Sequence, residues 1–323
     1  MRAAIVGGGF VGRVHARALA QIGVEVVGVW GRHDDLGRRL DAERPDVLHV
    51  CTPNALHAEQ ALAAIERGIH VVCEKPLAVS GEEAARMVEA AAHAGLVAAT
   101  CYHVRGYPNV ERMRTAVAGG EVGEVRLVHG RYLCDDVLHG NGGWRLRPES
   151  SGPSYVVADL GAHWLDLAEH VTGLRVLEVR AEFRGQPLED SAALLLRLEG
   201  GANGSLLLSA GAAGRKNQLL FECEGSRGGL TWDQERPDEL LFRHADRPTE
   251  LVLKDAATSR LAWYPAGHAE GYGEAFANVF REVYRAVAGE EHEQFPTFED
   301  GHRGVRAVEA AVASARSGDW VEV

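Results

Sequence analysis

Residues 1–12 read MRAAIVGGGFVG, and this stretch decides the fold of the chain. An apolar run enters a glycine turn, and the helical pattern HARALAQIG follows at 15–23. In a GxGxxG turn the first glycine permits a tight bend, the second lets a pyrophosphate approach the backbone, and the third allows close helix packing. The free N–H groups that open the helix suit an anion. The alternative is a purely structural turn, and we expect a dinucleotide site at Gly7, Gly9, Phe10, Val11 and Gly12.

Outward from this turn, apolar runs alternate with helical patterns. The runs lie at 3–8, 25–31, 46–53, 70–76 and 97–102, and the helical patterns at 15–23, 35–43, 58–68 and 82–95. Runs without polar alternation are typical of parallel strands buried on both faces. We therefore predict an α/β fold whose residues 1–120 form a Rossmann domain with a doubly wound parallel sheet.

The pattern changes after Gly119 and Gly120. Strand-like stretches follow at 124–134, 175–185, 191–201, 203–211, 217–225, 239–244 and 250–254, separated by turn residues. Helical patterns lie at 154–171, 274–289 and 300–318. We predict a second α/β domain over 121–323, with a large, mostly antiparallel open sheet, used for substrate binding and oligomerisation. The last two helices can pack back on the Rossmann domain.

Composition limits the function classes. A chain of 323 residues suggests two domains. The net charge of −12 disfavours a nucleic acid or an anionic membrane surface as partner. No apolar run reaches the roughly 18 residues of a membrane span, and no signal peptide is expected. The five cysteines include no CxxC pair, which favours reduced thiols and a cytoplasmic location.

The residues after the second strand bear on the choice of cofactor. A carboxylate about 20 residues beyond the glycine turn would grip the ribose hydroxyls of NAD. Gly31, Arg32 and His33 stand there instead, and a guanidinium can pair with a 2′-phosphate. The alternatives are that Arg32 is only a solvated arginine and that Asp34 or Asp35 reaches the ribose. We favour NADP over NAD.

Lys75 follows the fourth strand in the stretch CEKP and is one of only three lysines. Ligands of open α/β sheets bind beyond the carboxyl ends of the strands, so Lys75 should face the cofactor crevice. Pro76 restricts it to an extended backbone. A lysine there can donate a hydrogen bond to a reacting oxygen or act as a base. The alternative is an ordinary surface lysine in a β–α turn.

Asp159, His163 and Asp166 are spaced i, i+4 and i+7, which places them on one face of the expected helix at 154–171. A histidine one turn from a carboxylate is a suitable proton acceptor. The other interpretations are a solvent-facing polar stripe and a metal site. No further His or Cys cluster supports the metal, so we expect none.

At this point the sequence resembles the Gfo/Idh/MocA family. The resemblance rests on GGGFVG at 7–12, CTPNALH at 51–57, GIHVVCEKPLA at 68–78, GGEVGEV at 119–125, GGWR at 142–145 and DLGAHWLDL at 159–167. It covers most of the chain up to Gly173. It implies a Rossmann domain followed by an α/β domain with an open sheet.

The resemblance also implies roles for individual residues. Lys75, His163 and Asp159 match catalytic positions, and Asp166 matches a substrate contact. The residues expected in the cofactor loops and near the nicotinamide are Thr52, Pro53, Asn54, His57, Glu74, Lys75, Trp144 and Arg145. Two departures stand out: Gly31 replaces a frequent acidic residue, and the stretch 102–108 keeps Arg105 and Pro108 without the usual neighbours. The substrate contacts we expect are Lys75, His103, Arg105, Arg145, Asp159, His163 and Asp166.

These observations predict an NAD(P)-dependent oxidoreductase that transfers a hydride to or from a secondary hydroxyl or ketone of a sugar, cyclitol or sugar derivative. His163 and Lys75 would handle the proton and polarise the oxygen. Two alternatives stay open: a non-catalytic NAD(P) or sugar sensor, and an enzyme with tightly bound NAD and no net redox change. We also expect a homodimer or homotetramer formed through the open sheet.

Overall fold

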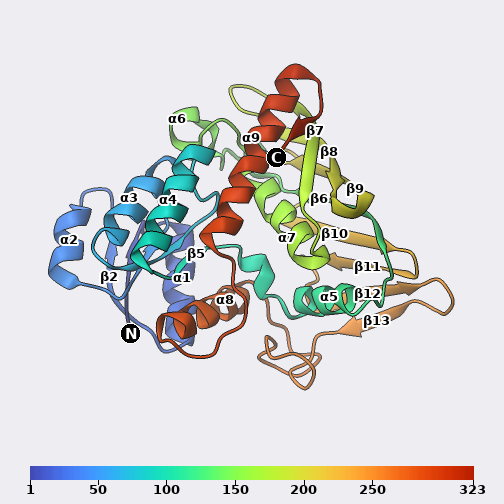
Figure 1. The fold of residues 1–323 in the computed structure, drawn as a ribbon, viewed down its shortest axis with the longest axis horizontal. Coiled ribbons are helices and arrows are strands. Elements are labelled where there is room, and N and C mark those ends of the chain that lie inside the picture. The colour runs from blue at the N-terminus through green and yellow to red at the C-terminus, as the bar shows by residue number, and fades with distance from the viewer. The chain divides into compact units, whose positions relative to one another are not determined.

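The computed structural model describes residues 1–323, and the chain forms two compact units (Figure 1). The first unit comprises Met1–His103, Glu149–Gly152 and Tyr272–Val305. The second comprises Val104–Pro148, Pro153–Gly271 and Arg306–Val323. Residues 104–120, which the sequence pattern assigns to the Rossmann domain, belong to the second unit.

The first unit is built on a parallel sheet of five short strands. They are β1 (Arg2–Val6), β2 (Glu25–Trp30), β3 (Val47–Val50), β4 (His70–Cys73) and β5 (Ala98–Thr100), in the order β2-β1-β3-β4-β5. The order reverses between β1 and β3, which is the switch point where such sheets bind ligands. The carboxyl ends of β1, β3 and β4 carry the glycine turn, Thr52 and Lys75.

Helices cover this sheet. They are α1 (Phe10–Gln21), α2 (Leu36–Glu43), α3 (His57–Ile65) and α4 (Gly81–Ala94), joined by the short α6 (Pro148–Ser151) and by α8 (Tyr272–Val287). In α4, local sequence fixes both ends. The side chain of Ser80 accepts a hydrogen bond from the N–H of Glu83 at the N-terminus, and Gly95 ends the helix in the left-handed conformation. The late helix α8 packs against α1.

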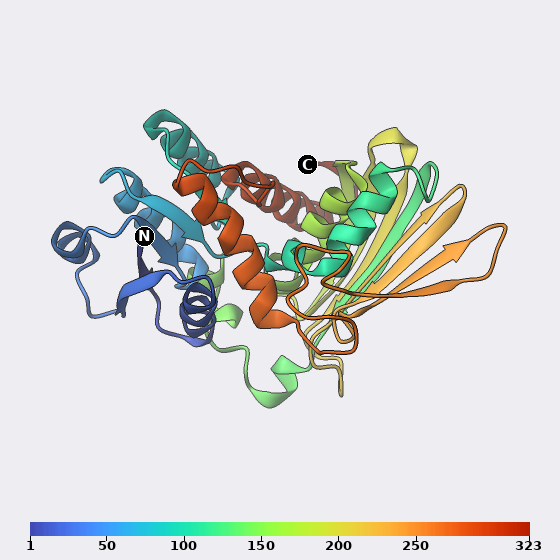
Figure 2. The same ribbon diagram turned by 90° about the horizontal axis from the view of Figure 1, so that it is seen from below.

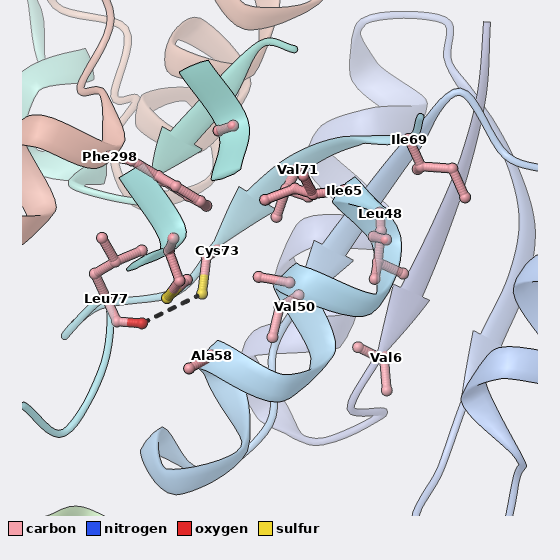
Figure 3. Close-up of a cluster of buried hydrophobic side chains, with 14 of the residues drawn as sticks. Val6, Leu48, Val50, Ala58, Ile65, Ile69, Val71, Cys73, Leu77 and Phe298 are labelled. Carbon is pink, nitrogen blue, oxygen red and sulfur yellow. Dashed lines mark hydrogen bonds between the residues drawn. The ribbon is translucent and has the colours of Figure 1, made fainter. Parts of the chain in front are cut away.

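The core on one side of the sheet is purely apolar. Val50, Val71 and Cys73 point from the strands toward α3 and α4 (Figure 3). Phe298, at the start of α9 (Phe298–Ser317), joins the same cluster. The preceding residue Thr297 bridges to Ala99 beside β5. The first unit therefore needs segments from both ends of the chain.

The second unit is built on a sheet of nine strands. They are β6 (Val125–Leu133), β7 (Val176–Arg184), β8 (Ser191–Leu198), β9 (Asn203–Ser209), β10 (Gln218–Gly225), β11 (Gly228–Asp233), β12 (Glu239–His244), β13 (Glu250–Leu253) and β14 (Val321–Glu322). The order is β13-β12-β11-β10-β6-β9-β8-β7-β14, and all neighbours are antiparallel except β6 and β9.

Helices cover one face of this sheet. The helices α5 (Pro108–Ala118) and α7 (Ala162–Thr172) pack on that face, and the opposite face carries none (Figure 2). Burial alternates along the strands accordingly, so Leu194 and Leu196 are buried whereas Leu195 is exposed. Trp164 of α7 donates its indole N–H to the carbonyl of Leu220 at 3.0 Å. No helix has the length and apolar character needed to cross a membrane.

The predicted fold class is confirmed, with three local corrections. The strands β11 and β14 were not expected, because GGLTWD has too many glycines and Val321–Glu322 is too short to show a pattern. The helix expected at 154–171 is α7 preceded by a π turn over Val157–Gly161. Asp159 therefore lies in the π turn, whereas His163 and Asp166 lie in α7.

Candidate active site

The glycine turn leaves open space for a phosphate. Gly7 has φ of +102°, and a Cβ there would collide with the carbonyl of Cys51. A Cβ on Gly12 would collide with the carbonyl of Gly7, whereas nothing lies within 4 Å of a Cβ built on Gly9. Helix α1 begins here with no side-chain cap and no acidic residue in its first turn. An anion over Gly9 therefore meets free N–H groups and no repelling carboxylate, which fits a dinucleotide pyrophosphate.

The turn after β2 holds an exposed arginine and an ionised aspartate whose charge is balanced by Arg39. The N–H of Gly31 donates to Asp34 Oδ2 at 2.9 Å, and Arg39 Nη2 lies 2.8 Å from Asp34 Oδ1. These two contacts, the backbone N–H first, lower the pKa of Asp34. Arg32 and His33 are exposed, and Arg32 Nε donates to His33 Nε2 at 3.1 Å. The turn thus offers a cation whose carboxylate neighbour is already engaged.

The loop after β3 is tied to the Lys75 turn by a histidine. The ring nitrogens of His57 lie 2.8 Å from the carbonyl oxygen of Pro76 and 2.9 Å from that of Thr52. Burial lowers the pKa of His57. Thr52 donates to Gln60 at 2.7 Å, and Asn54 donates to the carbonyl of Ser151 at 3.0 Å. Pro53 is half-buried in the same loop.

Lys75 is half-buried and sits beside a buried carboxylate. Its backbone N–H donates to Glu74 Oε2 at 3.1 Å, and the Lys75–Pro76 peptide bond is cis. Burial would raise the pKa of Glu74, but the hydrogen bond from His15, together with the nearby Lys75, outweighs it and lowers that pKa to about 2. The turn therefore places Lys75 beside a carboxylate that is ionised at neutral pH.

His103 follows β5 within the same unit. Its ring stacks on Phe276 at 4.4 Å with 12° between the planes and meets Tyr272 edge-on at 4.9 Å. Burial lowers the pKa of His103 to about 3. The imidazole is therefore neutral at physiological pH and can contact a ligand as a hydrogen-bond partner, not as a cation.

The second unit holds the other expected groups around its π turn. Arg145 Nε lies 3.1 Å from Asp159 Oδ2, and its guanidinium lies over the Trp144 ring at 4.8 Å. The buried His163 faces Tyr132, with the ring centroids 6.3 Å apart. Asp159 is thus fixed by a cation, and π turns are frequent at functional sites.

Arg105 and Asp166 were both expected to contact substrate, and the structure brings them together. The two Arg105–Asp166 bonds measure 2.9 and 2.5 Å, and both residues are buried. Each charge is therefore largely balanced by the other.

Glu189, which was not expected from the sequence, accepts hydrogen bonds from the residues at the start of the π turn. Its Oε1 accepts from Ser154 Oγ at 2.5 Å, from the N–H of Tyr155 at 2.9 Å and from that of Val157 at 3.2 Å. Burial raises its pKa. No sequence signal marks it, because it comes from the loop between β7 and β8.

His15, also not identified from the sequence, contacts Glu74 at 3.1 Å. A detectable signal existed here: His15 is spaced i+3 from Gly12 on the helix face that must pack against the sheet.

Comparison with known proteins identifies the family of the chain. Residues 1–102 match the model of the Gfo/Idh/MocA oxidoreductase family with an NAD-binding Rossmann fold, and residues 110–231 match that of the Gfo/Idh/MocA C-terminal domain. An uncharacterized oxidoreductase of Bacillus subtilis is 30% identical over 87% of this chain and 79% of its own length. The levoglucosan dehydrogenase of Pseudarthrobacter phenanthrenivorans is 27% identical over 99% of this chain and 97% of its own.

A solved structure extends the likeness to the whole fold. The inositol dehydrogenase homolog of Azotobacter vinelandii, in complex with NAD+, superposes with a TM-score of 0.90 at 30% identity and covers 100% of this chain and 97% of that one. The fold of this chain is thus shared over its whole length with a solved oxidoreductase structure. The chain belongs to the Gfo/Idh/MocA family of NAD-binding oxidoreductases.

Proposed function

We propose that this protein is a dehydrogenase or reductase acting on a secondary hydroxyl or ketone of a sugar, cyclitol or sugar derivative. The observation that carries the proposal lies in the first unit, where one sheet edge bears the glycine turn, the Thr52 loop and Lys75. Relatives named for levoglucosan and inositol support the substrate class.

In this proposal the cofactor lies along that edge. Gly7, Gly9, Phe10, Val11 and Gly12 would hold its pyrophosphate, and Gly31, Arg32 and His33 its adenosine ribose. Thr52, Pro53, Asn54, His57 and Glu74 would line the rest of it, with Trp144 and Arg145 near the nicotinamide. The bound nicotinamide supplies the chemistry of accepting or donating a hydride.

The protein's own groups would handle the proton. His163 accepts the hydroxyl proton as the alcohol is oxidised and returns it in reduction. Asp159, held by Arg145, orients His163, while Lys75 donates a hydrogen bond to the oxygen on which charge develops.

The remaining expected contacts would position the substrate. His103 is neutral and stacked on an aromatic ring, so it suits a hydroxyl group. The Arg105–Asp166 pair offers donors and acceptors in a rigid arrangement, which suits neighbouring hydroxyls of a carbohydrate. These roles are part of the proposal.

We propose a preference for NADP over NAD, resting on Arg32. Asp34 is engaged by Gly31 and Arg39, so the exposed guanidinium can meet a 2′-phosphate. Arg32→Ala should weaken NADPH binding at least about 10-fold and leave NADH binding unchanged, because a charge-assisted bond contributes roughly 1.5 to 3 kcal/mol. Equal effects on both cofactors would refute the preference.

One screen tests the activity. Purified protein is mixed with polyols, cyclitols, anhydrosugars or keto-sugars and with NAD, NADP or their reduced forms, and the absorbance of the reduced nicotinamide is followed. Net turnover of at least one compound is expected. Cofactor that stays bound through purification and shows no net redox change on turnover would favour the alternative enzyme type, and binding without turnover would favour a sensor.

We also propose that a second copy of the chain covers the open sheet face, and that the protein works in the cytoplasm. Leucines on the uncovered side of the strands support the first point, namely Leu127, Leu195, Leu207 and Leu241. For the second, none of the five cysteines forms a disulfide.

A further inference from the structure

Four buried polar groups form one hydrogen-bonded chain through the first unit. Tyr284 Oη lies 3.0 Å from His49 Nε2, His49 Nδ1 lies 2.9 Å from His15 Nδ1, and His15 Nε2 lies 3.1 Å from Glu74 Oε1. They come from α8, β3, α1 and the turn after β4, and none is more than 8% exposed. The chain ends on the residue directly before Lys75.

Only one arrangement of protons satisfies all three contacts while both imidazoles are neutral and Glu74 is ionised. A carboxylate can only accept, so His15 donates its Nε2–H to Glu74. The Nδ1 of His15 must then accept, and His49 donates its Nδ1–H to it. The Nε2 of His49 is left to accept from the hydroxyl of Tyr284. All three bonds therefore point toward Glu74.

The surroundings favour this charge pattern. Burial lowers the pKa of His49, so its ring is neutral, and the pKa of Glu74 is lowered to about 2. Burial raises the pKa of the neighbouring thiols of Cys51 and Cys101, so these thiols carry no charge. The other titratable groups that face the chain are Cys51, Cys73, Cys101, His57, Lys75, His103 and Asp46.

Aromatic rings of α8 insulate the two imidazoles. Phe280 lies 4.8 Å from the His15 ring and 4.9 Å from the His49 ring, and Phe276 lies 5.4 Å from His15. Hydrogen bonds in such a low-dielectric setting polarise one another. At the outer end, burial and the charge of Asp46 raise the pKa of Tyr284, and Asp46 lines a surface pocket. The chain thus connects the cofactor edge with a region near solvent.

We propose that Tyr284, His49 and His15 are a proton relay that ends on Glu74, and that it gives the reaction a second proton route, through Lys75, beside the route through His163. This inference rests on the proposed dehydrogenase function. The three relay residues are positioning and transfer residues and need not touch the substrate.

The step balances without any electron transfer. For inward transfer the His15 Nε2–H bond breaks as a Glu74 O–H bond forms, the proton on His49 Nδ1 moves to His15 Nδ1, and the Tyr284 proton moves to His49 Nε2. Water reprotonates the Tyr284 oxygen. The three bonds then point away from Glu74, and the reverse sequence carries a proton outward. In reduction, Glu74 passes this proton to the Lys75 amine, which has given one of its own to the reacting oxygen. In oxidation, the outward sequence removes from Glu74 the proton that Lys75 has gained from that oxygen.

The first experiment needs no activity. Nitrogen-15 NMR of histidine-labelled protein should show His15 protonated on Nε2 and His49 on Nδ1. Tyr284→Phe removes only the hydroxyl and should shift the His49 Nε2 resonance toward that of an imine nitrogen without a hydrogen bond. Cys51→Ala is the matched control, because Cys51 Sγ is the other neighbour of His15 Nδ1, at 3.3 Å, and lies outside the relay. It should leave the His49 resonances in place.

The second experiment measures proton transfer during turnover. In mixtures of H₂O and D₂O the wild-type rate should depend non-linearly on the deuterium fraction, as expected when several protons move. Tyr284→Phe should make that dependence linear and slow turnover about 10-fold, less than the roughly 10²- to 10⁴-fold effect of a direct acid–base group.

Several results would overturn the relay. These are any other protonation pattern of the two imidazoles, a Tyr284→Phe protein whose deuterium dependence matches wild type, or tight zinc binding by His15, Glu74 and Cys101, whose ligand atoms lie within 4.8 Å of one another. If the wild type turned over no substrate, the proposed function would fail, while the NMR result would still decide whether the chain is protonated as the relay requires.

Discussion

Arg105 and Asp166 face each other in a two-bond ion pair whose side chains are only 7% and 3% exposed. Asp166→Ala would leave the buried guanidinium without this carboxylate, which should cost about 3 to 5 kcal/mol in the free energy of unfolding. Replacing both partners, with Arg105→Met and Asp166→Leu, should cost less. Urea unfolding measures both effects.

The exposed pair Arg112–Glu121 is the control, at 2.7 Å and with side chains 36% and 40% exposed. Glu121→Ala should cost no more than about 1 kcal/mol. A similar cost for Glu121→Ala and Asp166→Ala would show that burial does not determine the strength of these pairs.

Gly9→Ala and Gly12→Ala should separate cofactor binding from folding. Gly9 has φ of −69°, and nothing lies within 4 Å of an added Cβ, so the variant should fold with wild-type stability and still lose dinucleotide affinity. Gly12→Ala should lose both stability and dinucleotide affinity, because its Cβ would collide with the carbonyl of Gly7. Thermal unfolding and fluorescence titration with NADH distinguish the two. Normal NADH binding by Gly9→Ala would place the pyrophosphate elsewhere.

Lys75→Ala and His163→Ala should each lower kcat by about 10²- to 10⁴-fold and leave cofactor binding mostly intact. The reason is that each is proposed to act on the substrate oxygen or its proton. Lys216→Ala, with a side chain 70% exposed, is the matched lysine control and should turn over normally. Stopped-flow kinetics with cofactor titration measures this. Wild-type rates in both variants would rule out the proposed acid–base scheme.

Acid should destabilise the protein below about pH 6.5. Burial lowers the pKa of His103 to about 3, so between 6.5 and 3 the unfolded chain binds a proton that the folded chain does not. The free energy of unfolding therefore falls as the pH drops through this range, by up to about 1.4 kcal/mol per pH unit for this group.

His103→Phe should reduce that slope, because phenylalanine can keep the stacking on Phe276 without titrating. His292→Phe, at an exposed position, serves as the control. Urea unfolding at several pH values measures the slopes. An unchanged slope in His103→Phe would assign the acid sensitivity to other groups.

Leu207→Glu should dissociate the proposed oligomer. Leu207 is 57% exposed on the uncovered face of the nine-stranded sheet, where a charge would be buried against a second copy. Leu138→Glu is matched in exposure, also 57%, and lies outside the sheet. Light scattering after gel filtration should show a smaller mass only for Leu207→Glu. A monomeric wild type, or no change in Leu207→Glu, would refute the interface.

The doubly wound parallel sheet and most elements could be predicted because buried parallel strands are apolar runs and the helices between them repeat with period 3.6. Single positions were harder. The scarcity of lysine pointed to Lys75, but it points equally to Lys254, whose Nζ lies 2.9 Å from Glu270 Oε2 with both side chains almost fully buried. Residue counts cannot separate these cases, because what differs is the partner contributed by a distant segment.

The same limit applies to the candidate site. The motif positions Gly7, Gly9 and Lys75 lie on loops fixed by local sequence. Glu189 and the His15–His49 contact depend on pairings across 34 or 35 residues, and a single sequence carries no signal for them. The π turn at Asp159 likewise arises from packing and not from helix periodicity.

The entry of α8 and the start of α9 into the first unit has a consequence for biosynthesis. A ribosome must deliver the chain to about Val305 before Tyr284, Phe280 and Phe298 can close over the strands made first. Until then the nascent amino-terminal half exposes His15, His49 and apolar strand residues, a state open to chaperone capture or aggregation. A premature stop before Tyr272 would therefore cost the cell both units, since neither would contain all of its segments.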